Sequence, residues 1–188
     1  MEAGSLNDAL GLLEKSLKMN KTVLGEDDVS NAGIYSTLSK VYLKKKDYDN
    51  AINNLSKVWE LTENHFGKDS AQIASVYSDF AKLYFKKKDF EEAISYQKKS
   101  IDYFRNSEAD ADVEKRADAC ITCSDWLIKI KNHDEALELL KEAAEIYECN
   151  YGLADKKTCK IKRDIALLLL KSQKKYDEAL EVMLEVEE

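Results

Sequence analysis

The sequence predicts an all-α protein built as a solenoid of antiparallel helix pairs. One phrase recurs, because KKKDYDNAI at residues 44–52 returns as KKKDFEEAI at residues 86–94, an interval of 42 residues. The 188-residue chain also contains no proline and only six glycines, as expected of long helices with few breaks. Recurrence at an interval of this size is typical of tandem helical repeats.

Weaker copies of the phrase extend the array in both directions. NDALGLLEKS begins at Asn7, IKNHDEALEL at Ile130 and QKKYDEALEV at Gln173, at steps of 42 or 43 residues. One alanine keeps its place in every copy, and we expect it to let the two helices of a pair approach closely. These alanines are Ala9, Ala51, Ala93, Ala136 and Ala179.

Helix limits follow from capping residues and from apolar spacing. Asp47 and Asp89 precede helices whose first amide groups they can bind. Gly25, Gly67 and Gly152 follow apolar residues at positions where glycine tolerates the backbone geometry that ends a helix. We expect nine helices, near residues 5–23, 28–45, 48–65, 69–87, 90–106, 112–130, 133–149, 154–172 and 176–188.

The first helix of each pair presents an apolar face. Tyr35, Leu38 and Tyr42 have spacings of three and four, which place them on one side of a helix. A small residue usually follows the second member of such a trio, and we expect it to allow close helix packing; these residues are Ser39, Ala81 and Ser124, and Leu167 is the exception. The third repeat has NSEADAD at residues 106–112 where the others have glycine, so we expect a longer, more mobile loop there.

Composition narrows the class of partner. Charged residues make up 35% of the chain, and the net charge is −7. Nonspecific DNA binding needs a basic surface, so we expect no nucleic-acid partner, and this charge gives no reason to expect a membrane partner. No apolar run approaches the roughly 20 residues that cross a bilayer. The four cysteines lack the spacing of a secreted disulfide framework, so we expect a cytoplasmic protein.

The CITC motif, Cys120 to Cys123, raises a metal or redox interpretation. Both cysteines occupy positions that are apolar in the other repeats, and buried cysteine packs as a small hydrophobic residue. A zinc site would need two further ligands. His65 and His133 lie in separate repeats, and no phosphate-binding loop occurs. We therefore expect no metal, no cofactor and no enzymatic activity. Trp126 is predicted to lie in the core.

The repeats resemble the tetratricopeptide repeat. An aromatic residue, a leucine, a small residue and a tyrosine in one helix precede an alanine in the next. The usual unit has about 34 residues, and the longer unit here, with turns such as LGEDD (24–28) and FGKDS (66–70), is similar to kinesin light chain repeats. The resemblance implies a right-handed superhelical array over residues 1–188. We expect a half repeat at 5–27, repeats at 28–69, 70–111 and 112–153, and a truncated repeat at 154–188.

The resemblance also implies a concave groove, lined by the first helix of each pair, that holds a peptide or a partner helix. Lys40 and Lys82 should stack on adjacent helices and form a basic stripe that steers an acidic segment. The alternative is that these lysines are ordinary solvated charges near helix ends. The predicted groove residues are Ser36, Lys40, Lys44, Ser78, Asp79, Lys82, Lys86 and Asp125; Asp164, Leu168 and Lys171 are the matching positions further along the chain.

Three functions fit this pattern. The first is an interaction scaffold or adaptor that binds a peptide or helix in the groove. The second is a structural subunit of a large ciliary, cytoskeletal or transport assembly, or a self-associating chain, that packs through its ends. Leu180, Met183 and Leu184 lack a polar cap, from which we expect either a longer array or a partner that covers them. The third is a regulatory module of a larger protein.

Overall fold

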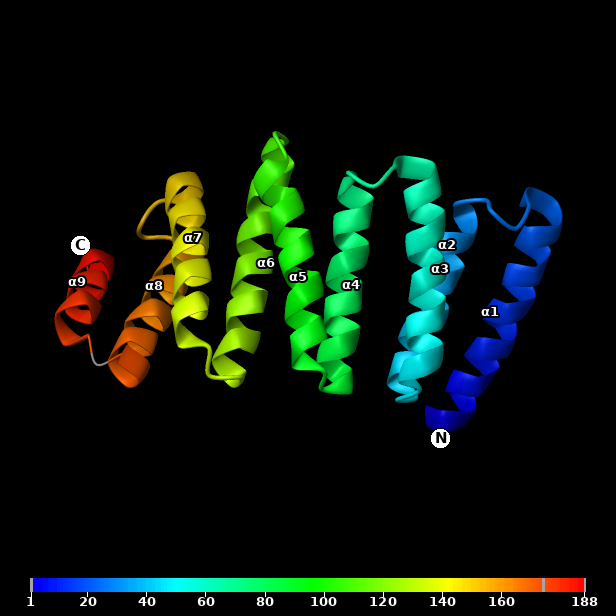
Figure 1. Cartoon of the computed structure of the whole chain (residues 1–188), viewed down its shortest axis with the longest axis horizontal. Coiled ribbons are helices and arrows are strands. Elements are labelled where there is room, and N and C mark those ends of the chain that lie inside the picture. The colour runs from blue at the N-terminus through cyan, green and yellow to red at the C-terminus, as the bar shows by residue number, and fades with distance from the viewer. Residues whose placement is uncertain (1, 174, 188) are drawn as a thin grey trace. The chain divides into compact units, whose positions relative to one another are not determined.

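The computed structural model describes residues 2–173 and 175–187, and all regular structure in these ranges is helical (Figure 1). The all-α prediction is confirmed, and helix limits lie within a few residues of those expected. The expected end of the last helix at Glu188 lies outside the described residues. The helices are α1 (Glu2–Leu24), α2 (Ser30–Lys44), α3 (Tyr48–Phe66), α4 (Ala71–Lys87), α5 (Phe90–Asn106), α6 (Asp110–Lys129), α7 (His133–Tyr151), α8 (Lys156–Leu168), a π-helical turn η1 (Leu169–Gln173) and α9 (Tyr176–Glu187).

The chain divides into two compact units, Met1–Tyr103 and Phe104–Glu188, which we call the N-terminal and C-terminal units. Within each unit, consecutive helices pack antiparallel (Figure 1). None of the described helices is long and apolar enough to cross a membrane. The repeat boundaries inside the units remain a prediction.

The core of the N-terminal unit forms between α2, α3 and α4. Leu55, Phe80 and Leu83 are buried there, and Trp59 packs half-buried against the same cluster. Ala51 has no exposed surface, because the Ser39 hydroxyl approaches closely enough to donate a 2.8 Å hydrogen bond to its carbonyl. Ser39 and Ala51 therefore allow α2 and α3 to approach closely, as predicted. Of the register alanines, Ala51, Ala93, Ala136 and Ala179 are buried.

The core of the C-terminal unit includes both residues of the cysteine motif. Cys120 and Cys123 have no exposed surface. Burial, the largest effect, raises the pKa of the Cys120 thiol to about 12, so this residue packs as a small apolar side chain. Trp126 is also buried, as predicted.

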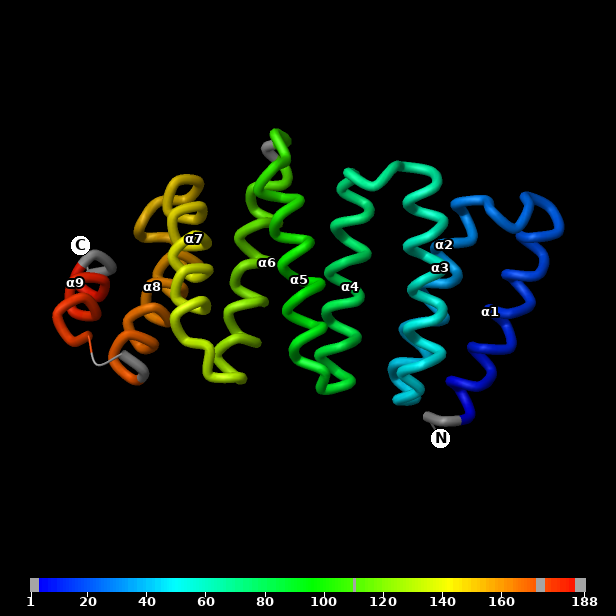
Figure 2. Tube along the Cα trace, in the orientation of Figure 1, coloured from blue at the N-terminus to red at the C-terminus, as the bar shows by residue number. Residues whose placement is uncertain are grey.

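Three of the repeated turns share an unusual backbone conformation. Lys46, Lys88 and Lys131 adopt positive φ angles of 61°, 70° and 64°. The following residue closes each turn, as when the Asp47 amide donates to the Tyr42 carbonyl at 2.9 Å. Figure 2 traces these turns between α2 and α3, α4 and α5, and α6 and α7. The fourth copy falls at residue 174, outside the described residues.

The expectation of a long loop at residues 106–112 is wrong. Only residues 107–109 separate α5 from α6. The Ser107 hydroxyl and the Lys115 ammonium group contact the buried Asp112 carboxylate at 2.7 and 2.8 Å. The acidic segment therefore begins a helix, because its charge is satisfied locally and suits a helix N-terminus.

Candidate functional site

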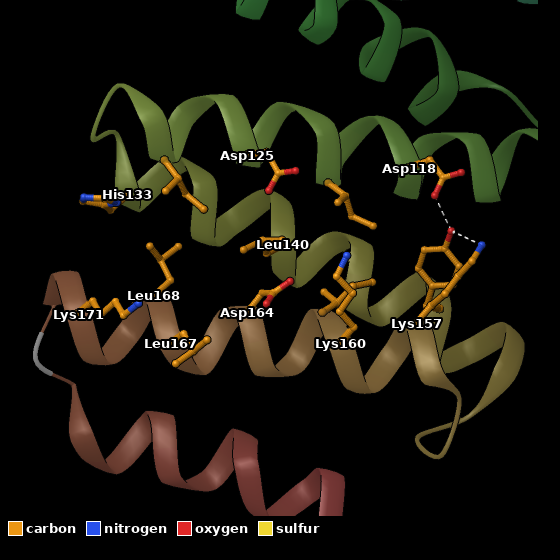
Figure 3. Close-up of a pocket in the computed structure, with 14 residues that line it drawn as sticks. Asp118, Asp125, His133, Leu140, Lys157, Lys160, Asp164, Leu167, Leu168 and Lys171 are labelled. Carbon is orange, nitrogen blue, oxygen red and sulfur yellow. Dashed lines mark hydrogen bonds between the residues drawn. The ribbon is translucent and has the colours of Figure 1, made fainter.

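The largest described cavity lies in the C-terminal unit, between α6 and α8, and measures about 560 Å³. The second helix of the pair, α7, forms its floor (Figure 3). We call this cavity the α6–α8 groove. Its lining residues are Asp118, Ile121, Asp125, Ile128, His133, Leu140, Tyr147, Lys157, Lys160, Ile161, Asp164, Leu167, Leu168 and Lys171.

Helical spacing explains how the groove is lined. On α6, Ile121, Asp125 and Ile128 follow at intervals of four and three, so they share one face. On α8, Asp164 and Leu168 repeat the same spacing on the opposite wall. Between the walls, Leu140 comes up from α7 (Figure 3). The result is an apolar floor with charged groups on both walls.

One end of the groove is closed by an internal polar network. The Tyr147 hydroxyl donates a 2.6 Å hydrogen bond to Asp118 and accepts one of 3.1 Å from the Lys157 ammonium group (Figure 3). Lys157 also pairs with Glu114 at 3.0 Å and lies over the Tyr147 ring. Burial and then the bond to Asp118 raise the pKa of Tyr147 to about 12. The hydrogen bond from Lys157 to Tyr147, followed by that to Glu114, raises the pKa of Lys157.

The middle of the groove holds two carboxylates that lack this kind of support. Asp125 on α6 and Asp164 on α8 point toward one another across the groove (Figure 3). Partial burial, and then the charge of Asp164, raise the pKa of Asp125 above its ordinary value, while Lys160 and Lys129 act in the opposite direction. Among the described residues, no side chain hydrogen-bonds to Asp125, and the ion pair of Asp164 is a long one with the adjacent Arg163 at 3.9 Å.

The structure gathers part of the predicted lysine stripe in the N-terminal unit. A smaller cavity of about 120 Å³ lies between α2 and α4. We call it the α2–α4 groove. Lys82 there forms a 3.8 Å ion pair with Asp79. Its lining residues are Ser36, Ser39, Lys40, Leu43, Leu55, Asp79, Lys82 and Leu83.

The other predicted residues are placed differently. Lys44 and Lys86 are exposed and line none of the described cavities. The Ser78 hydroxyl shares a 2.9 Å hydrogen bond with Ser100 of α5, so it is turned toward that helix. Asp125 lines the α6–α8 groove of the other unit.

Sequence reasoning missed the polar end of the α6–α8 groove. Tyr147 lies on α7, the second helix of its pair, whereas groove residues were sought on first helices alone. Lys157 and Lys160 lie in the first turns of α8, before the positions that correspond to Lys40 and Lys82. A test for polar residues that a first helix can reach on its partner helix would have pointed to Tyr147.

Family models match the part of the chain that precedes the α6–α8 groove. Models of the tetratricopeptide repeat match residues 1–30 and 30–106. The chain belongs to the tetratricopeptide repeat family. The repeats of this family stack helix pairs into binding surfaces, which supports a role in protein–protein interaction. A comparison with curated proteins gives no significant match.

Several solved structures share the fold. A putative kinesin light chain with nearly identical TPR-like repeats from Podosopora anserina aligns over 99% of this chain and 87% of its own, with 16% identity and a TM-score of 0.74. BtubC (BKLC) from P. vanneervenii aligns over 96% and 71%, with 14% identity and a TM-score of 0.69. Aspartyl phosphate phosphatase F from Bacillus subtilis aligns over 98% and 48%, with 16% identity and a TM-score of 0.67. At these identities the likeness is one of fold alone.

Proposed function

We propose that this tetratricopeptide repeat protein is an interaction scaffold that holds a peptide or an amphipathic helix of a partner protein in the α6–α8 groove. The observation that carries the proposal is the groove itself, a cavity of about 560 Å³ with an apolar floor and charged walls. Binding sites combine apolar surface with a few placed polar groups in this way. We assign the protein no catalytic role and place its action in the cytoplasm.

The shape of the groove favours a peptide segment over a small molecule. Its wall on α8 and η1 extends from Lys157 to Lys171, which corresponds to about 20 Å of helix. About six extended residues, or about four turns of helix, would fill this length. Ile121, Ile128 and Leu168 offer apolar contacts at intervals that suit the anchor residues of a helix laid into a groove.

The lysines of the N-terminal unit remain a second candidate surface of the same protein. Lys40 and Lys82 both line the α2–α4 groove, which supports the proposal that they steer an acidic segment. That cavity is smaller, and Lys82 already pairs with Asp79. We therefore give the α6–α8 groove the leading role.

The alternative role, a subunit that packs through its ends, draws on a different set of side chains. Leu180 and Leu184 on α9 are 60% and 53% exposed, and Leu12 and Met19 on α1 are 68% and 69% exposed. Apolar surface of this kind suits stacking against another chain. A regulatory module of a larger protein could use either surface.

Affinity capture from a lysate of the source cells, followed by quantitative mass spectrometry, tests the proposal with three baits. These are the wild-type chain, the groove variant Ile121→Asp/Leu167→Asp and the control Lys40→Glu/Lys82→Glu. We expect the groove variant to lose a partner that the wild type and the control retain, with equal melting temperatures for all three. Loss of a partner in the Lys40→Glu/Lys82→Glu variant alone would assign partner binding to these lysines instead. Retention by both variants would contradict the proposal and favour the chain ends.

A further inference from the structure

We infer that the partner segment carries one basic side chain, arginine in preference to lysine, which lies between Asp125 and Asp164, with apolar residues on either side of it. This inference rests on the proposed function, because it names the chemistry of the segment that the α6–α8 groove would hold. It is carried by the position and the surroundings of the two carboxylates.

The two carboxylates face each other from opposite walls of one cavity. Asp125 comes from α6 and Asp164 from α8, and Leu140 lies between the walls (Figure 3). Like charges in partly apolar surroundings repel each other, and a cation between them removes the repulsion. The raised pKa of Asp125, caused by burial and then by Asp164, is consistent with this arrangement.

The lysines of the groove do not supply that cation within the described residues. Lys157 is held at the closed end by Glu114 and Tyr147. Lys160 extends into the groove and its charge lowers the pKa of Asp125 (Figure 3). Neither Lys160 nor Lys171, however, forms an ion pair with Asp125 or Asp164 in the part of the chain that the structure describes. The place between the carboxylates is therefore open to a basic group from a partner.

The different lengths of the aspartate and lysine side chains disfavour an acidic partner at the centre of the groove. An aspartate side chain is short, so its backbone fixes where the charge lies. A lysine side chain is long and flexible and can extend its ammonium group into water. A basic segment would thus meet lysines that can move away, whereas an acidic segment would meet two carboxylates that cannot.

A metal ion is a weaker candidate than a guanidinium group. No group of three or more histidine, cysteine, aspartate or glutamate side chains in the described ranges could hold a metal ion. Two carboxylates alone leave most of the coordination shell of a divalent cation unfilled. A guanidinium group instead donates several hydrogen bonds in one plane and can bridge two carboxylates.

The flanking lysines limit the partner to one basic side chain. On α8, Lys160 lies four residues before Asp164, and Lys171 of η1 lies seven residues after it. These separations correspond to about 6 and 10 Å. A second cation in the partner would therefore come near one of these ammonium groups, while apolar residues would meet Leu140 on the floor and Leu168 on the α8 wall.

Peptide selection tests this inference without knowledge of the natural partner. A phage-displayed library of randomised helical peptides, about 15 residues long to span the groove, is panned against the wild-type chain. It is panned in parallel against Asp125→Lys/Asp164→Lys. We expect the wild type to enrich peptides with a single arginine or lysine between apolar residues, and the charge-reversed variant to enrich aspartate or glutamate at that place. Asp69→Lys, an exposed position of the N-terminal unit outside both grooves, is the matched control and should leave the wild-type consensus unchanged.

A synthetic copy of the selected peptide then gives the size of the effect. Replacing its basic residue with glutamine should weaken binding to the wild type about tenfold, as expected for loss of a charge-assisted contact. The same replacement should have little effect on binding to the variant Asp125→Asn/Asp164→Asn, because this variant lacks the carboxylates that the basic residue would contact.

The possible failures are distinguishable. A consensus without a basic residue, or one that stays basic after charge reversal, would contradict the inference and leave groove binding intact. If the wild type enriched no more peptide than Ile121→Asp/Leu167→Asp, the proposed function would fail, and the inference would fail with it.

Discussion

The α2–α4 groove and the α6–α8 groove are built from equivalent positions of the repeat, yet they differ in size and in charge. Leu55 and Leu140 occupy the same place on the floor, 85 residues apart or two repeat steps, and are equally buried. Around them the cavities measure about 120 and about 560 Å³. The repeat therefore provides a common framework, while the side chains on the groove face decide what each groove can hold.

The charges differ for a reason that can be followed through the repeat steps. Lys40 and Lys82 correspond to Asp125 and then to Leu168. In the α2–α4 groove, Lys82 pairs with Asp79 on its own helix. In the α6–α8 groove, charges of the same sign instead face each other from two helices. Lys82 and Asp164 each have a long ion pair on their own helix, at 3.8 and 3.9 Å, so the two grooves differ mainly in the sign of their central charges.

Truncation of the two floor leucines should give the largest effect. We expect Leu55→Ala to lower the free energy of unfolding by about 3 kcal/mol, within the range for a buried leucine. Leu140→Ala should cost about 2 kcal/mol, because water from the open groove can fill part of the space. Urea unfolding followed by circular dichroism measures both. A greater loss for Leu140→Ala would mean that the α6–α8 groove is closed in solution.

Tyr147→Phe should give an intermediate effect that is specific to the C-terminal unit. Loss of the hydrogen bond to Asp118 should cost about 1 kcal/mol near neutral pH. Because the pKa of Tyr147 is raised in the folded protein from 10.0 to about 12, its stabilising contribution is complete below pH 10 and is lost as the pH rises toward 12. The difference in urea midpoint between wild type and variant should therefore shrink above pH 10.

The exposed Tyr176 provides the matched control for this measurement. Tyr176→Phe should leave both the midpoint and its pH dependence unchanged. An absorbance titration adds a second test, since Tyr147→Phe should remove a phenol that ionises late. A wild type whose phenols all titrate together near pH 10 would rule out the buried network.

Neutralising Asp125 and Asp164 should give the smallest change in the free energy of unfolding. Unlike most substitutions, it should stabilise the protein. Asp125→Asn/Asp164→Asn should raise the free energy of unfolding by at most about 0.5 kcal/mol, because both groups are partly exposed and screened by solvent. Lys40→Gln/Lys82→Gln should have no such effect. The raised pKa of Asp125 makes its ionised form the less stable one, so the gain should be present at pH 7 and vanish below pH 3.8. Thermal unfolding at the two pH values measures this, and a destabilised aspartate variant would show that the carboxylates have a structural partner.

The sequence predicted most of the fold because helix formation depends on local signals. Asp47 and Asp89 accept bonds from amide groups of the first turns, as expected. Gly25, Gly67 and Gly152 adopt positive φ angles at the predicted helix ends. The missing glycine at residues 106–112 predicts a long loop, and this is wrong because Asp112 has local partners and the segment begins a helix.

The candidate site was only partly predictable. Helical register puts Asp125 and Asp164 on one face of the first helices, and both line the α6–α8 groove, while their part in binding stays a prediction. It could not give the width of either groove, because this depends on how side chains from two separate helices fill the space between them. It also could not reveal that Tyr147 from the partner helix closes one end.

The turn lysines have a consequence for the growth of such an array. A non-glycine residue with a left-handed backbone carries a penalty of about 1–2 kcal/mol, and Lys46, Lys88 and Lys131 repeat it in successive copies. When a repeat is duplicated, its strained turn is duplicated as well, so the total penalty increases with copy number. Each added repeat must bring enough new packing between neighbours to outweigh its own turn, which sets a threshold for how far individual copies can diverge.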